Sequence, residues 1–283
     1  MLERKATVSG RTLWLGGTDV AKTREASQFN CSFGRIETVH DIVDAMWLLL
    51  QGCGVGFEPV VGTLNGFARV AELKTVRSTK VGDSAEAWAK SAGKLFAMKD
   101  AVDVIVMDFT EVRASGERLK GYGWISSGDE TISVAFNRIC QLLNNRAGQL
   151  LTRMDILDVL NHLGTTLSSR RSAEIALVPV DDPEIDDFIS AKKDFWLHDN
   201  AHRQQSNNSV MFHKKPTKWE LSYIFDRMVE AGGSEPGFIN AEASLKRAPH
   251  FKGLNPCAEI LLGNKSFCNL VEVDWGKFKT NFG

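Results

Sequence analysis

The stretch NPCAEILLGNKSFCNLVEV, residues 255–273, decides the fold that this sequence predicts. It carries two of the five cysteines of the 283-residue chain, Cys257 and Cys268, and Glu259 follows the first of them by two residues. A negative charge beside a thiol raises the pKa of the thiol and disfavours a nucleophilic thiolate. A thiol that stays protonated can instead lose a hydrogen atom, while the carboxylate acts as a general base. On spacing alone, a hairpin with two incidental cysteines explains the stretch equally well.

The backbone expected for this stretch is a loop between two arms. Asn255 and Pro256 favour a turn and disfavour helix, so Cys257 is expected at the tip of a loop. An apolar run at 258–262 leads away from the tip, and Gly-Asn-Lys at 263–265 is suited to a reversal. The second cysteine then returns on the opposite arm.

Composition and charge exclude several classes of protein. Lys and Arg number 34 and Asp and Glu 35, so the formal net charge of −1 creates no field that favours nucleic acid. No run approaches the roughly 18 apolar residues of a membrane span, and the first residues lack the apolar core of a signal peptide. We expect a cytoplasmic protein that forms one unit over residues 1–283. An odd number of cysteines without CxxC or clustered His predicts neither a disulfide framework nor a metal site.

The apolar pattern predicts an α/β fold. Short, continuously apolar runs alternate with helical patterns, which is typical of βα units around a buried and largely parallel sheet. The clearest predicted strand is 102–109, and the others are 29–36, 173–180, 207–212 and 237–240.

Capping residues mark the expected helix starts. A Ser, Thr or Asp side chain accepts from backbone amides of the first turn, and the side chain of an acid three residues later accepts from the backbone amide of the capping residue. The pairs are Thr38 with Asp41, Asp83 with Glu86, Thr152 with Asp155, and Thr217 with Glu220. The helix after Thr217 is expected to end at Gly232 and Gly233. A further helix at 131–145 presents Ile132, Phe136, Ile139 and Leu143 on one face.

Other motifs carry weaker signals. GCGVGF at 52–57 follows a helix, the reverse of the order in a dinucleotide-binding loop, so we interpret it as tight packing of a helix against a strand. Cys53 is then structural, and Cys140 is interpreted as a core or boundary residue of the helix at 131–145. Arg170 and Arg171 suit phosphate or base edges, although composition alone favours a solvated surface pair.

Five further motifs accompany the opening stretch along nearly the whole chain. They are SGRTLWLGGTDVAKTREASQFNCSF, LLNNRAGQLLTRMDILDVLNHLG, RRSAEIAL, DDFISAKKD and SNNSV. Together with NPCAEI and CNLVEV, and in the same order, they resemble motifs of ribonucleotide reductases. The resemblance is closest to the adenosylcobalamin-dependent class II enzymes, especially their monomeric, triphosphate-reducing branch.

The resemblance implies a role for five residues. Cys257 would carry the thiyl radical that abstracts the ribose 3′ hydrogen, Glu259 would take the 3′ hydroxyl proton, and Asn255 would hold the substrate. Cys31 and Cys268 would be the dithiol that supplies two electrons and closes to a disulfide. The chain would therefore reduce ribonucleoside triphosphates.

The resemblance also implies a fold and two nucleotide loops. The fold is the first half of the ten-stranded α/β barrel of these enzymes, with the active-site finger loop at about 253–272. Arg170, Arg171 and Ser172 would belong to the loop that reads the substrate base, and the segment Arg113 to Glu130 would lie near the effector-binding loop. That segment lies between a strand and a helix, where α/β folds place ligand loops.

The implied cofactor is adenosylcobalamin, and the implied partners are a deoxynucleotide effector and an external dithiol such as thioredoxin. We find no second half-barrel, phosphate-binding loop, cobalamin-facing segment or C-terminal cysteine pair. We therefore expect a split or truncated enzyme that needs a complementing C-terminal half. Two alternatives stay open: a fragment of a class I large subunit, whose radical comes from a metal-containing subunit, and a non-catalytic nucleotide-binding fragment.

Overall fold

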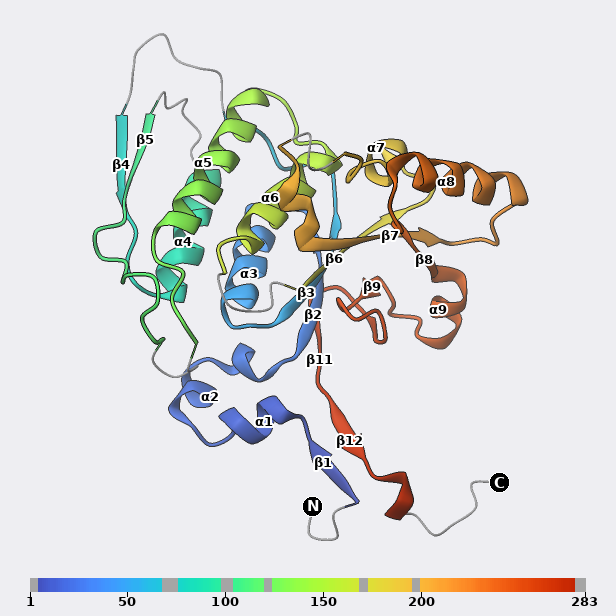
Figure 1. The fold of residues 1–283 in the computed structure, drawn as a ribbon, viewed down its shortest axis with the longest axis horizontal. Coiled ribbons are helices and arrows are strands. Elements are labelled where there is room, and N and C mark those ends of the chain that lie inside the picture. Colours follow the sequence, from blue (N-terminus) through green and yellow to red (C-terminus); the bar gives the residue numbers. More distant parts are fainter. Residues whose placement is uncertain are drawn as a thin grey trace.

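The computed structural model of the chain describes residues 5–67, 76–97, 104–119, 124–167, 173–194 and 199–277. Its centre is a six-stranded sheet in the order β11-β2-β3-β6-β7-β8 (Figure 1). The strands are β2 (Cys31–Ile36), β3 (Gly54–Pro59), β6 (Glu174–Pro179), β7 (Ser206–Phe212), β8 (Gly237–Asn240) and β11 (Ser266–Cys268). The strands β2, β3, β6, β7 and β8 run parallel to one another, and β11 runs antiparallel to β2. The sheet thus contains the five parallel strands expected of a half-barrel.

Both faces of this sheet are covered, which explains the continuously apolar strands. One face packs against α3 (Val39–Leu50), α4 (Ala85–Phe96), α5 (Glu130–Asn145) and α6 (Arg153–Gly164), which lie together on one side in Figure 1. The other face packs against the hairpin of β9 (Gly253–Leu254) and β10 (Leu261–Leu262), together with α9 (Ala241–Arg247). In β6, Ala176 and Val178 face the helices, whereas Ile175 and Leu177 face the hairpin. Strand alternation therefore builds two cores, one on each face.

Three of the four predicted helix starts are confirmed. Thr38, Thr152 and Thr217 each close a capping box with the acid three residues later. For α4 the prediction was wrong by one residue: Ser84 accepts from the Ala87 amide, and Asp83 instead accepts from Arg113 Nε at 2.8 Å. The four residues predicted on one face of α5 are all buried.

The helix after Thr217, α8 (Lys218–Ala231), ends at Gly232 with φ 68°. Its predicted C-cap is therefore confirmed, because glycine adopts the left-handed region without steric cost. α7 (Ile185–Ile189) packs against α8. No helix among the described residues is both long and apolar enough to cross a membrane.

The strand predicted at 102–109 is present, but its expected place in the buried sheet was wrong, and one central strand was not predicted. The stretch 102–109 forms β5 (Val104–Asp108), but β5 pairs with β4 (Val76–Lys80) in a separate two-stranded sheet at the edge of the molecule (Figure 1). Val106 is 45% exposed, so β5 is not a strand of the buried sheet. The central strand β3 was not predicted, because its glycines dilute the apolar pattern.

The remaining elements lie around the ends of the sheet. β1 (Ala6–Val8) pairs with β12 (Val271–Val273) in a ribbon that projects from the body in Figure 1. The short helices are α1 (Gly10–Leu15), α2 (Asp19–Thr23), η1 (Glu25–Gln28), η2 (Ala201–Gln205) and η3 (Trp275–Lys277).

Candidate active site on the finger loop

The predicted loop between two arms is present. β9 and β10 pair antiparallel, with Leu254 opposite Leu261, and the loop at 255–260 joins them. Cys257 and Glu259 are exposed, whereas Asn255 at the start of the loop is completely buried. The tip therefore presents a thiol and a carboxylate on a buried base.

Asn255 holds the loop in shape through both ends of its side chain. Its Nδ2 donates to Glu259 Oε2 at 2.8 Å, and its Oδ1 accepts from the Ile260 amide at 3.0 Å. Its carbonyl oxygen accepts from the amide of Ala258, whose φ is 63°. A side-chain amide that both donates and accepts thus sets the position of the carboxylate relative to Cys257.

Cys31 and Cys268 lie directly opposite each other on β2 and β11. Opposite residues of an antiparallel pair have Cα atoms about 4.5 to 5.5 Å apart, within the range of a disulfide. Both are buried free thiols, and Asn255 Nδ2 lies 3.8 Å from Cys268 Sγ. The structure therefore brings the two cysteines together and joins them to the loop tip through Asn255.

The environment keeps both of these thiols protonated. Burial, followed by the neighbouring Cys268 and Cys257, raises the pKa of Cys31 to about 12. Burial also raises the pKa of Cys268, and Glu259 adds to the increase. Neither thiol is a thiolate near neutral pH.

Glycines of β3 form the floor beneath the loop. A Cβ atom on Gly54 would lie 3.0 Å from Pro256 Cγ and 3.1 Å from Cys31 Sγ, and one on Gly56 would overlap the Leu254 carbonyl oxygen. α3 does pack against β3, as GCGVGF was interpreted, but Gly54 and Gly56 lie in the strand and admit the finger loop. Two glycines in alternate positions of an apolar run were the available signal.

The predicted reversal after the loop is also present, and it is anchored to α3. Lys265 has φ 55°, and its Nζ lies 2.8 Å from Asp41 Oδ1 and 3.5 Å from Asp44 Oδ2. The backbone amide of Arg35 donates to Asn264 Oδ1 at 2.8 Å. These contacts set where β11 begins and so help to place Cys268 beside β2.

The other predicted site residues are tested only in part. Arg170, Arg171 and Ser172 lie outside the described residues. Within the predicted effector segment, residues 120–123 also lie outside them, while Arg113 forms an ion pair with Asp83 at the start of α4.

A buried polar group at the start of β6 was not predicted. Glu174 is 2% exposed, and its Oε2 accepts from Asn161 Nδ2 at 2.9 Å. Asn161 also contacts Ser206, whose hydroxyl bonds to Asn208 at 3.1 Å. Burial raises the pKa of Glu174 well above its usual value and so favours the uncharged form of the carboxyl group. The signal for this buried polar group in the sequence was Glu174 itself, the one acid within the apolar run AEIALVPV at 173–180.

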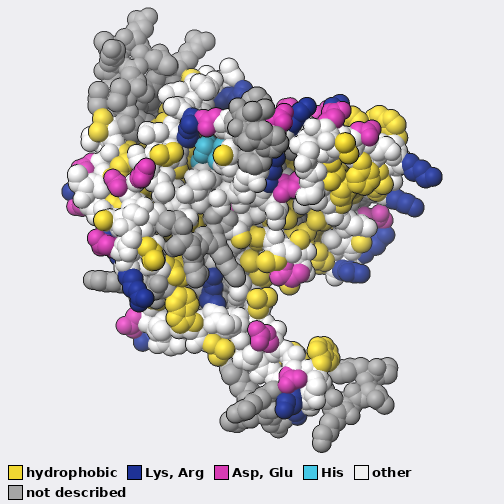
Figure 2. All heavy atoms as spheres, viewed as in Figure 1, with side chains coloured by type: hydrophobic (Ala, Val, Ile, Leu, Met, Phe, Trp, Pro, Cys, Tyr) yellow, Lys and Arg dark blue, Asp and Glu magenta, His cyan; other side chains and the backbone are white. Residues whose placement is uncertain are grey.

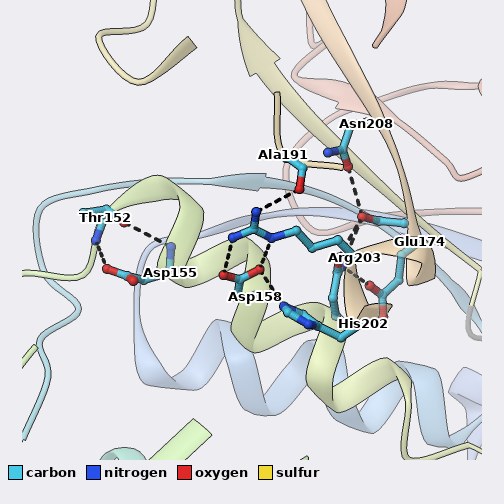
Figure 3. Close-up of polar contacts among 10 residues, drawn as sticks. Thr152, Asp155, Asp158, Glu174, Ala191, His202, Arg203 and Asn208 are labelled. Atoms are coloured by element: carbon cyan, nitrogen blue, oxygen red, sulfur yellow. Dashed lines mark hydrogen bonds and ion pairs between the residues drawn. The ribbon is translucent and has the colours of Figure 1, made fainter. Parts of the chain in front are cut away.

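A second polar group lies one turn earlier on α6. Asp158 contacts His202 Nε2 at 2.7 Å and accepts from Arg203 Nε at 2.6 Å and Nη2 at 2.7 Å, as Figure 3 shows. Arg203 also donates to the Ala191 carbonyl oxygen at 2.8 Å. One face of α6 therefore holds η2 and the amino ends of β6 and β7 in place.

Comparison with known proteins relates this geometry to a family. No family model matches the chain. The adenosylcobalamin-dependent ribonucleoside-triphosphate reductase of Lactobacillus helveticus is 30% identical over 95% of this chain and 45% of its own length. The reductase of the same description from Lactobacillus leichmannii is 28% identical with the same coverage. The chain is therefore similar, over nearly its whole length, to adenosylcobalamin-dependent ribonucleoside-triphosphate reductases.

A solved structure of a B12-dependent class II ribonucleotide reductase matches the fold with a TM-score of 0.78 and 26% identity. The match covers 95% of this chain and 46% of the other. The predicted α/β fold, part of the reductase barrel, is thereby confirmed. The chain spans about half the length of the curated reductases it matches.

Proposed function

We propose that the chain is the radical-bearing part of an adenosylcobalamin-dependent ribonucleoside-triphosphate reductase and works with a complementing chain. One observation carries the proposal: buried Asn255 binds Glu259 and contacts Cys268, which lies opposite Cys31. The thiol of Cys257, a carboxylate and a dithiol thus belong to one site. The homologous reductases supply the reaction class and the triphosphate substrate.

In this proposal each residue at the loop has one task. Cys257, as a thiyl radical, takes the ribose 3′ hydrogen, and Glu259 takes the proton of the 3′ hydroxyl group. Asn255 holds the substrate and keeps the carboxylate beside the thiol. A carboxylate that already accepts a hydrogen bond from Asn255 is oriented before substrate arrives.

Cys31 and Cys268 provide the reducing equivalents. Replacing the 2′ hydroxyl group by hydrogen consumes two electrons, and oxidation of two thiols to one disulfide supplies them, with water as the second product. The raised pKa values of both cysteines support this role, because a thiol delivers protons together with the electrons. An external dithiol of the thioredoxin type would restore the pair.

Among the described residues, the thiol of Cys257 fits the cofactor, because it is exposed at the tip of a loop that Asn255 anchors. When bound, adenosylcobalamin would supply the radical chemistry, and Cys257 would be the thiol that receives the radical.

The regulatory and organisational parts of the proposal rest on the motifs. Residues 1–283 form one unit, and its finger loop spans about 253–272. This unit acts in the cytoplasm. Arg170, Arg171 and Ser172 read the substrate base, and the segment Arg113 to Glu130 responds to a deoxynucleotide effector.

The test is reconstitution. The chain is mixed with the part of the Lactobacillus helveticus reductase that it does not cover, and reduction of a ribonucleoside triphosphate is assayed with adenosylcobalamin and dithiothreitol. We expect activity that Cys257→Ser abolishes, because an O–H bond is too strong for the hydrogen exchange. The control is Cys140→Ser, which changes a half-buried cysteine of α5 and should leave turnover intact. Activity with a diiron partner and no cobalamin would reject the proposal.

A further inference from the structure

One arginine of α1 binds backbone that leads into two different strands. Arg11 Nη1 donates to the carbonyl oxygens of Ser27 at 3.1 Å and Gln51 at 3.2 Å, and its Nη2 donates to that of Gly52 at 2.6 Å. Ser27 and Gln51 are both completely buried. The guanidinium group is therefore a bridge between segments far apart in the sequence.

The bound carbonyl groups lie just before the two strands that form the dithiol site. Ser27 is in η1, which leads into β2 and Cys31. Gln51 and Gly52 form the turn between α3 and β3, and Gly52 has φ 74°. β2 and β3 pair directly after these segments, because the Gly54 amide donates to the Asn30 carbonyl oxygen at 2.9 Å.

We propose that Arg11 is a positioning residue of the dithiol site, which holds the segments leading into β2 and β3 so that Cys31 stays opposite Cys268 and beneath the finger loop. The inference rests on the proposed redox role of this cysteine pair. Arg11 acts through the backbone carbonyl groups of Ser27, Gln51 and Gly52, which lie in the segments leading into β2 and β3.

The chemistry of this contact requires arginine. A planar guanidinium group carries five N–H donors in a rigid fork and can serve several carbonyl groups at once, whereas a lysine ammonium is a compact point charge on a flexible stem. Buried carbonyl groups that lose a charged donor are costly to leave without a partner. Arg11→Lys is thus expected to hold the two backbone segments less well than arginine, and Arg11→Gln to lose most of the bridge.

Arg24 offers a matched control from the same N-terminal region. Its Nη2 lies 3.1 Å from Glu86 Oε1 at the start of α4. Arg24→Gln therefore removes an arginine and an ion pair that ties the N-terminal region to α4.

The experiment measures the equilibrium between the Cys31–Cys268 dithiol and its disulfide in the full chain. Wild type, R11K, R11Q and R24Q are equilibrated in glutathione redox buffers, the free thiols are alkylated, and the disulfide is quantified by peptide mass mapping. Melting temperatures are recorded in parallel. We expect the equilibrium constant to fall about tenfold in R11Q, because a less well placed thiol lowers the effective concentration of the pair. R11K should fall between wild type and R11Q, and R24Q should match wild type within about twofold.

Each result bears on a separate claim. An unchanged constant in R11Q, or an equal decrease in R24Q, overturns the positioning role while leaving the proposed function intact. A wild-type chain that forms no Cys31–Cys268 disulfide overturns the redox assignment itself, and the positioning role with it. Should R11Q fail to fold, R11K decides, since a constant equal to that of wild type contradicts the inference.

Discussion

Asn255 is the residue through which the loop tip and the cysteine pair contact each other. It is buried, binds Glu259 and the Ile260 amide, and lies against Cys268. Asn255→Ala removes a buried side chain and leaves the half-buried Ile260 amide without its acceptor, so we expect the free energy of unfolding to fall by about 1 to 3 kcal/mol. Urea unfolding measures this. Asn144→Ala, at an exposed position of α5, is the control and should change stability by less than about 0.5 kcal/mol. Equal effects of the two substitutions would contradict the assigned role.

Glu174 should make stability depend on pH. Its pKa is raised in the folded chain because of burial, so the folded state binds a proton that the unfolded state releases above the ordinary pKa of 4.5. Stability is therefore highest below that value and falls as pH rises towards the folded pKa, by up to about 1.4 kcal/mol per pH unit. Glu174→Gln keeps an uncharged side chain of the same shape and removes this dependence.

We expect E174Q to melt at a higher temperature than wild type at pH 8, with a difference that shrinks towards pH 5. Thermal unfolding across this range measures it. Glu117→Gln, at an exposed position, should follow the wild-type curve throughout. Parallel curves for E174Q and wild type would show that Glu174 is not the responsible group.

At the scale of elements, the close approach of the β9–β10 hairpin to β3 depends on the absence of a side chain at Gly56. A methyl group on Gly56 would overlap the Leu254 carbonyl oxygen and displace the hairpin from the sheet. We expect Gly56→Ala to cost about 1 to 3 kcal/mol, as overpacking does, and to speed hydrogen exchange of the Ile260 amide. The matched control is Gly34→Ala in β2, where a Cβ atom meets nothing within 4 Å. Slow exchange at Ile260 in both variants would refute this account.

Elements whose ends depend on neighbouring residues were predicted well. The capping boxes at Thr38, Thr152 and Thr217 lie within four residues of sequence, and so do the turn residues around Pro256. The predicted strands are also present, but an apolar run does not reveal which strand it pairs with. β5 is as apolar as a central strand yet pairs only with β4 among the described residues.

At the scale of the whole molecule, the described chain leaves apolar surface open. β8 pairs with β7 alone within the described part, and Figure 2 shows hydrophobic side chains gathered near α8 and β8. Trp219, Phe225, Val229 and Phe238 are exposed there. Open strand edges and apolar patches favour association.

We therefore expect the isolated chain to self-associate and to lack activity, and its melting temperature to rise when a complementing chain binds. Light scattering after size-exclusion chromatography measures the first expectation. Val229→Glu places a charge on the patch and should reduce the association. An active and monodisperse monomer would show that the functional unit is smaller than proposed.

Local chemistry in the sequence determined the loop tip at Cys257, the neighbouring carboxylate, the helix starts and the α/β class. Only the tertiary structure decided that Cys31 faces Cys268, that Gly54 and Gly56 admit the finger loop, and that Arg11 joins the segments leading into two strands. The reason is physical. Turns and caps depend on residues a few positions apart, whereas strand register, close backbone approach and burial arise from hydrogen bonds and packing between distant segments.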